Sequence, residues 1–189
     1  EDEGHRINRA EVQTARYAQA ELKHIGTADL RFIYEATGEI TRFTDRHDPI
    51  PRAREGFQFY RPETLAEWRS QSASLRARLQ NFPQLRPDGL RDCQFNAINK
   101  LETSFKENRP RALIQMATGA GKTFTAITGI YRLLKHARVS RVLFLVDTRN
   151  LGVQAENEFH QYLPFDDDPA STELYTVQRL RSPHVPTDG

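Results

Sequence analysis

The sequence predicts an α/β fold for the second half of the chain, with a mostly parallel sheet and flanking helices. Two short segments, residues 112–116 and 142–146, have the unbroken apolar character of parallel strands that are covered on both faces. Helical apolar spacing is present at residues 92–107, 122–135 and 150–162, and a further strand is expected at 174–177. Because strands alternate with helices along the chain, we expect βαβ units.

The first half of the chain has a different pattern. It predicts a helix over residues 8–23, a β-hairpin from residues 30–36 and 39–44 with its turn at Thr37-Gly38, and a loop over 46–56. Pro62 suits the first turn of a helix, which the apolar spacing extends to near Phe82-Pro83. We therefore expect three parts: a domain over residues 1–60, a linker helix and loop over 61–89, and a second domain over 90–189.

Composition excludes several classes of protein. The chain has 189 residues, 38% of them hydrophobic, and no apolar run approaches the roughly 20 residues that a membrane span needs. No signal-peptide pattern is visible either, so we expect a cytoplasmic protein without a membrane partner. A net charge of +2 indicates that any polyanion must be bound by local groups. The single cysteine, Cys93, is expected to be small and buried, and the histidines show no metal-ligand spacing.

The most informative motif is Met-Ala-Thr-Gly-Ala-Gly-Lys-Thr at residues 116–123, between a predicted strand and a predicted helix. Gly119 and Gly121 would let backbone N–H groups approach phosphate oxygens at the positive end of the helix. Lys122 would reach the β- and γ-phosphates, and the hydroxyl of Thr123 would hold Mg²⁺. These two residues are the predicted catalytic pair, and the predicted site for ATP and Mg²⁺ comprises Gln94, Thr118, Gly119, Ala120, Gly121, Lys122 and Thr123. The alternative is a glycine turn with an incidental lysine, since Met116 stands where the strict pattern has glycine.

The form Ala-Thr-Gly-x-Gly-Lys-Thr resembles motif I of superfamily 2 helicases and translocases. Upstream, Leu-Arg-Asp-Cys-Gln-Phe-Asn-Ala-Ile at residues 90–98 resembles the segment that carries the adenine-reading glutamine of that family, here Gln94. Downstream, Asp-Thr-Arg-Asn-Leu-Gly-Val-Gln at 147–154 resembles motif Ia, which implies DNA-backbone contacts by Thr148 and Arg149. The stretch 176–180 resembles the next backbone-contacting motif and adds Thr176.

Residues 115–123 and 143–151 together look like the restriction (R) subunit of type I restriction-modification enzymes. The resemblance implies a partial RecA-like P-loop domain, preceded by the end of a PD-(D/E)xK-like α/β nuclease domain whose Gln-x-x-x-Tyr signature Gln13 and Tyr17 match. It further implies ATP-driven translocation on double-stranded DNA, DNA cleavage, and partnership with modification and specificity subunits.

Other functions stay open at this point. One is another superfamily 2 motor, of the type III restriction or repair type, and another is a binding module that holds DNA or a partner subunit without hydrolysis. No Asp-Glu-x-His stretch follows the phosphate loop, so we expect these 189 residues alone not to turn over ATP. An R subunit would carry the metal-binding residues of its nuclease ahead of Glu1.

Overall fold

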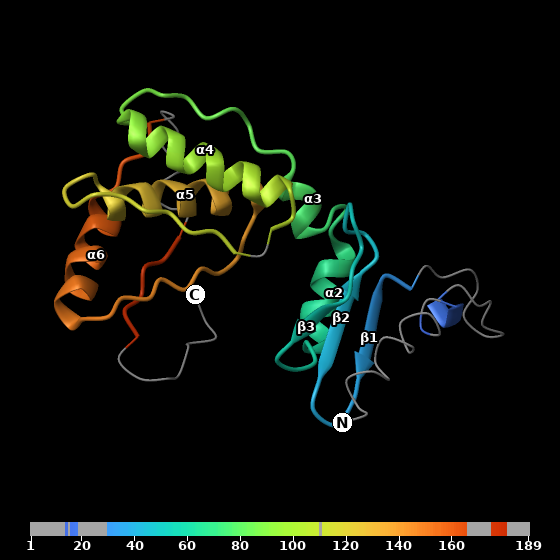
Figure 1. The fold of residues 1–189 in the computed structure, drawn as a ribbon. Coiled ribbons are helices and arrows are strands. Elements are labelled where there is room, and N and C mark those ends of the chain that lie inside the picture. Colours follow the sequence, from blue (N-terminus) through green and yellow to red (C-terminus); the bar gives the residue numbers. More distant parts are fainter. Residues whose placement is uncertain (1–13, 15, 19–29, 110, 166–174, 181–189) are drawn as a thin grey trace. The chain divides into compact units, whose positions relative to one another are not determined.

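The computed structural model describes residue 14 and residues 16–18, 30–109, 111–165 and 175–180. The chain divides into two compact units, residues 1–77 and 78–189 (Figure 1). The predicted domain boundaries after residues 60 and 89 stay predictions, because compactness does not reveal the identity of a domain.

A three-stranded antiparallel sheet forms the centre of the first unit (Figure 1). The strands are β1 (Phe32–Ala36), β2 (Thr41–Asp45) and β3 (Arg54–Gly56). The predicted hairpin is confirmed: β1 pairs with β2, and the turn is closed by the amide of Thr37, which donates to the Ile40 carbonyl at 2.8 Å. β3 lies inside the stretch 46–56, which was predicted to be a loop. The sequence did not indicate this strand because three residues are too few to show an alternating pattern.

Aromatic side chains cover one face of this sheet. Phe32 and Tyr34 lie two residues apart on β1 and share a face. Phe43 on β2 stacks on the ring of Phe32 and makes a tilted contact with the ring of Tyr34. Helix α2 (Pro62–Ser70) adds Trp68, whose ring lies 6.0 Å from that of Phe43 and 4.7 Å from that of Tyr60. Tilted and edge-to-face pairs of this kind add to the stabilisation from buried area.

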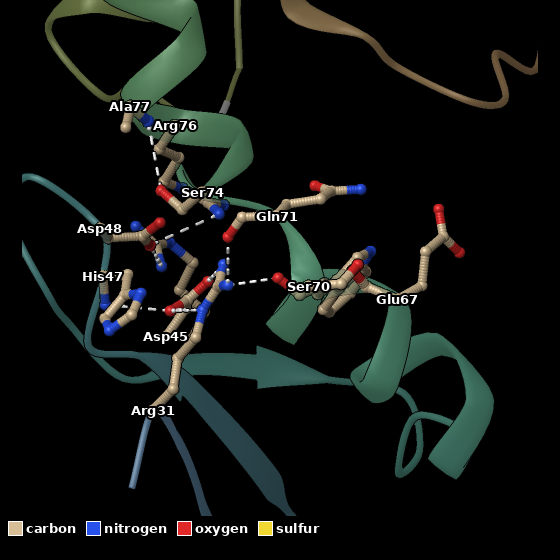
Figure 2. Close-up of polar contacts among 12 residues, drawn as sticks. Arg31, Asp45, His47, Asp48, Glu67, Ser70, Gln71, Ser74, Arg76 and Ala77 are labelled. Carbon is tan, nitrogen blue, oxygen red and sulfur yellow. Dashed lines mark hydrogen bonds and ion pairs between the residues drawn. The ribbon is translucent and has the colours of Figure 1, made fainter. Parts of the chain in front are cut away.

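The helix predicted after Pro62 is interrupted. α2 ends at Ser70, and a separate short helix, α3 (Leu75–Leu79), begins after Ser74, whose hydroxyl accepts from the Ala77 amide at 3.2 Å. At the break, the guanidinium of Arg31 donates to the Trp68 carbonyl, and to the Gln71 carbonyl at 3.3 Å (Figure 2). Arg31, the residue before β1, therefore adds side-chain hydrogen bonds to carbonyls at the C-terminal end of α2, where few helical N–H groups are available.

Two buried carboxylates near this break are paired with arginines (Figure 2). Asp45 binds Arg31 through both oxygens, at 2.9 and 2.8 Å, and Asp48 accepts from Arg54 at 2.8 Å. Arg76 lies 3.7 Å from Asp48, and its pKa is lowered by burial and by the charge of Arg54. Losing one member of such a pair leaves a buried charge without compensation, so these pairs specify how the β1–β2 end meets the end of α2.

Three helices make up most of the second unit: α4 (Asp92–Lys106), α5 (Lys122–Ala137) and α6 (Arg149–Gln161). All three predicted helices are confirmed to within two residues at each end. α4 lies alongside α5 (Figure 1), and the fully buried Ile98 and Ile127 come one from each helix. The buried Glu102 on α4 binds Arg132 on α5 at 2.5 and 3.2 Å, and the same guanidinium donates to the Pro83 carbonyl at 2.6 Å.

The predicted parallel sheet is absent from the part of the chain that the structure describes. Residues 112–116 and 142–146 form no hydrogen-bonded strand, and their apolar side chains are largely exposed, Leu113 at 95% and Leu145 at 80%. The described part of the predicted strand 174–177 is unpaired as well. A strand exists only through hydrogen bonds to a neighbour, so an apolar run does not form one by itself. Within the described residues, no helix combines the length and apolar character that crossing a bilayer demands.

Candidate functional site

The glycine loop adopts the backbone that its sequence suggests. Gly119 has a φ of +77°, and Gly121, with a φ of +81° and a ψ of +45°, caps the N-terminus of α5 in the left-handed region. Between them, the Ala120 amide donates to the Ala117 carbonyl at 3.2 Å and closes a turn. A Cβ atom placed on Gly119 would meet nothing within 4 Å, so the outer side of the loop is open. Glycine suits both positions because it adopts positive φ without steric strain.

Lys122 and Thr123 are the first two residues of α5, directly after the loop. The Lys122 side chain is exposed and folds back over the loop, where its Nζ donates to the Ala117 carbonyl at 3.2 Å. Thr123 is half-buried. Unpaired backbone N–H groups at the start of the helix, together with the ammonium group, make this end of α5 electropositive, as binding of an anion requires.

Gln94 lies beneath the loop rather than beside it. Its side chain is buried, its Oε1 accepts from the Arg91 amide at 3.0 Å, and its Nε2 donates to the Ala120 carbonyl at 3.1 Å. A Cβ atom on Gly121 would lie 2.3 Å from that Nε2, so the second glycine is also required by this close approach. The amide of Gln94 therefore connects the start of α4 to the loop.

Arg91 is a loop contact that the sequence did not single out. Its Nη1 donates to the Gly119 carbonyl at 2.9 Å, so a second carbonyl of the loop is held from the N-terminal end of α4. The spacing in the sequence could have indicated this role, since Arg91 precedes Gln94 by three residues at the start of a helix, as the two residues of a capping box do.

The prediction that Cys93 is buried was wrong. On the first turn of α4 it faces solvent, because Gln94 and Ile98 take the inward positions.

The predicted DNA-contacting residues lie at and near the start of α6. Thr148 is the N-cap, with its hydroxyl accepting from the Leu151 amide at 3.4 Å, and the exposed Arg149 is the first helical residue. A pocket of about 620 Å³ adjoins them, lined by residues 143–149, one face of α6 and residues 177–180. The structure thus brings the two stretches that resemble backbone-contacting motifs to one pocket. Thr176 is exposed and immediately precedes the lining residues.

The predicted nuclease signature is only partly covered by the structure. Gln13 lies outside the described residues, and Tyr17 is 63% exposed. Whether these two side chains share one helix face therefore stays a prediction.

Comparison with known proteins gives a consistent result. The family model described as "Type III restriction enzyme, res subunit" matches residues 88–184. The chain is 38% identical over 103 residues to the type I restriction enzyme EcoKI endonuclease subunit of Escherichia coli (strain K12), which covers 54% of this chain and 9% of that protein. It is 42% identical over 72 residues to the type I restriction enzyme EcoAI endonuclease subunit of Escherichia coli, covering 38% of this chain and 9% of that protein.

A third relative is the type I restriction enzyme SsaAORF53P endonuclease subunit of Staphylococcus saprophyticus, 28% identical over 97 residues that cover 51% of this chain and 10% of the relative. The chain thus spans about a tenth of the length of these relatives. No solved structure matches it. These relatives confirm the resemblance to type I R subunits that the motifs indicated.

Proposed function

The chain belongs to the family of the type III restriction enzyme res subunit, and we propose that it supplies the nucleotide-binding loop and the first DNA contacts of a type I restriction subunit. That subunit would be an ATP-driven translocase on double-stranded DNA and an endonuclease, working in the cytoplasm with modification and specificity subunits. The observation that carries the proposal is the pair of glycines with positive φ in the loop that leads into α5, with open space beside Gly119.

The residues of the loop fit a nucleoside triphosphate with Mg²⁺. The open side at Gly119 leaves room for phosphate oxygens, and the exposed ammonium of Lys122 contacts only a carbonyl that an anion would outcompete. Thr123, on the first turn of α5, is the residue that would hold the metal. When bound, ATP with Mg²⁺ supplies the phosphoryl transfer that drives such motors.

Gln94 supports the proposal in a second way. One lone pair of its Oε1 and one N–H of its Nε2 are used within the protein, which leaves one acceptor and one donor position on the amide. An adenine edge offers the complementary donor and acceptor. Selection of adenine and support of the phosphate loop would then depend on the same side chain.

The exposed apolar segments are consistent with a RecA-like sheet that further strands complete. Five successive residues, 142–146, present apolar side chains and unpaired backbone groups, which a parallel sheet would cover. Residues 112–116 would be the strand ahead of the phosphate loop. In this arrangement Thr148, Arg149 and Thr176 would lie at the carboxyl edge of the sheet, where they would contact the DNA backbone.

Residues 1–60 are proposed to be the end of a nuclease-like α/β domain. The support is the resemblance around Gln13 and Tyr17, together with the strand and hairpin at residues 30–45. The acidic residues that would carry out DNA cleavage belong to another part of such a domain.

The decisive experiment is Lys122→Ala in the intact protein, with Lys100→Ala on the exposed side of α4 as a matched loss of one lysine. We expect DNA-stimulated ATP hydrolysis to fall by about a hundredfold or more in the first variant and to stay unchanged in the second, because only Lys122 is placed to neutralise phosphate charge. Equal activity of the two variants would contradict the proposal. An intact protein that binds DNA without any DNA-stimulated hydrolysis would instead be an adaptor.

A further inference from the structure

The exposure of the side chains alternates along residues 175–180. Tyr175, Val177 and Arg179 are half-buried, whereas Thr176, Gln178 and Leu180 are exposed. A period of two is what an extended segment shows when one side faces the protein and the other faces solvent. Arg179 is therefore on the inward side, opposite to Thr176.

The inward side is attached to the rest of the second unit at two points. Tyr175 packs against the core formed by Ile127, Tyr131 and Tyr162. Four residues later, Arg179 lies 3.4 Å from the carboxylate of Glu156 on α6. An extended chain covers about 13 Å over this interval, so the two attachments define the direction and the rotation of the segment between them.

Glu156 has an unusual position for an acidic residue. It shares one face of α6 with Gly152, Ala155 and Phe159, at the i, i+3, i+4 and i+7 spacing that marks the inward face of a helix. Ala155 is buried and Phe159 packs against the core, so a carboxylate here has apolar neighbours along its own helix face. Its ionic partner is Arg179, and the two side chains are equally exposed, at 29%.

We infer that the Glu156–Arg179 ion pair is a positioning element that presents Gln178, together with Thr176, to the DNA backbone. This inference rests on the proposed function. Gln178 lines the same pocket as Thr148 and Arg149, and its exposed amide donates hydrogen bonds of the kind that phosphate oxygens accept. Gln178 is thus assigned as a further DNA-contacting residue, and Arg179 acts through the backbone that it holds.

The alternative role for Arg179 is a direct contact with phosphate, and a charge exchange separates the two. In the intact protein, Glu156→Gln and Arg179→Gln are each expected to weaken DNA binding about two- to fivefold, the range for a partly exposed ion pair. The exchange Glu156→Arg with Arg179→Glu restores the attachment and is expected to return the affinity to the parent value. Gln178→Ala weakens binding in either background.

Glu158→Gln is the matched control, because it also removes a carboxylate from α6. Glu158 accepts a hydrogen bond from Gln154, and neither residue lines the pocket. DNA affinity is measured by titration at two salt concentrations, and ATP affinity is measured in parallel to show that the loop is intact. Three results overturn the inference: an exchange variant weaker than Arg179→Gln, tighter binding by Glu156→Gln, or no effect of any of these changes. Absence of DNA binding by the parent protein would refute the proposed function itself.

Discussion

Replacing Gly121 by alanine tests how the phosphate loop is held. The backbone of Gly121 is left-handed, with a φ of +81°, and a new Cβ atom would lie 2.3 Å from Nε2 of Gln94. Gly119 provides a natural control, since its φ of +77° is almost the same and a Cβ atom there would meet nothing within 4 Å. The difference between the two alanine variants therefore isolates the contact with Gln94.

The expected magnitudes follow from these contacts. A non-glycine residue in the left-handed region costs about 1–2 kcal/mol, and this is the whole expected effect of Gly119→Ala. In Gly121→Ala the side chain of Gln94 must also move, which breaks its hydrogen bonds to the Ala120 carbonyl and the Arg91 amide. At about 1 kcal/mol each, these bonds raise the expected loss to about 3–4 kcal/mol.

Amide hydrogen exchange in the intact protein provides a local measurement of this loss. The reporter is the Thr125 amide, which donates to the Gly121 carbonyl at 2.9 Å and so exchanges when the start of α5 opens. With Gln94→Ala already present, Gly121→Ala is expected to add only the backbone cost of about 1–2 kcal/mol, since the clash is gone. Equal losses for the two glycine variants, or a Gly121→Ala loss that is independent of Gln94, would refute the reasoning.

Three further outcomes are expected. Glu102→Leu leaves the buried charge of Arg132 unpaired and should destabilise the α4–α5 packing by about 3–5 kcal/mol in urea unfolding. Adding Arg132→Leu should recover most of this loss, because no buried charge then remains unpaired. If the losses of the two substitutions simply add, the pairing is contradicted. Burial raises the pKa of Tyr175 above 10.0, so its contribution to stability is complete below pH 10.0 and declines as the pH rises through the folded-state pKa. The free energy of unfolding of Tyr175→Phe, measured across that pH range, should lack this decline. Gln94→Ala should narrow the preference for ATP over GTP in competition binding, and unchanged discrimination would remove Gln94 from adenine recognition.

The local elements of this protein could be read from the sequence because their signals are local. The apolar spacing of α4, α5 and α6 marks helices whose hydrogen bonds lie within four residues, and Thr37-Gly38 between two apolar runs marks a hairpin. The loop at 116–123 and its neighbours also indicated the family, since residue types at fixed spacing reflect the chemistry that they serve.

What the sequence did not show depends on partners that are distant along the chain. The break after α2 involves Arg31, which is 37 residues away from Trp68, and the short β3 exists only because β2 offers it an edge. Gln94 shows the same limit, because its helix position was predictable but its burial beneath Gly121 was not.

The apolar run at 142–146 shows most clearly what the sequence determines and what only the tertiary structure decides. Its composition was enough to predict a buried strand, yet in the described part of the chain its side chains are exposed. A strand needs a neighbour to accept and donate its backbone hydrogen bonds, and composition alone does not supply one. Residue types and spacing thus determined helices, turn and motif, whereas pairing, burial and the contacts that hold the loop were decided by the tertiary structure, because each requires two segments to meet.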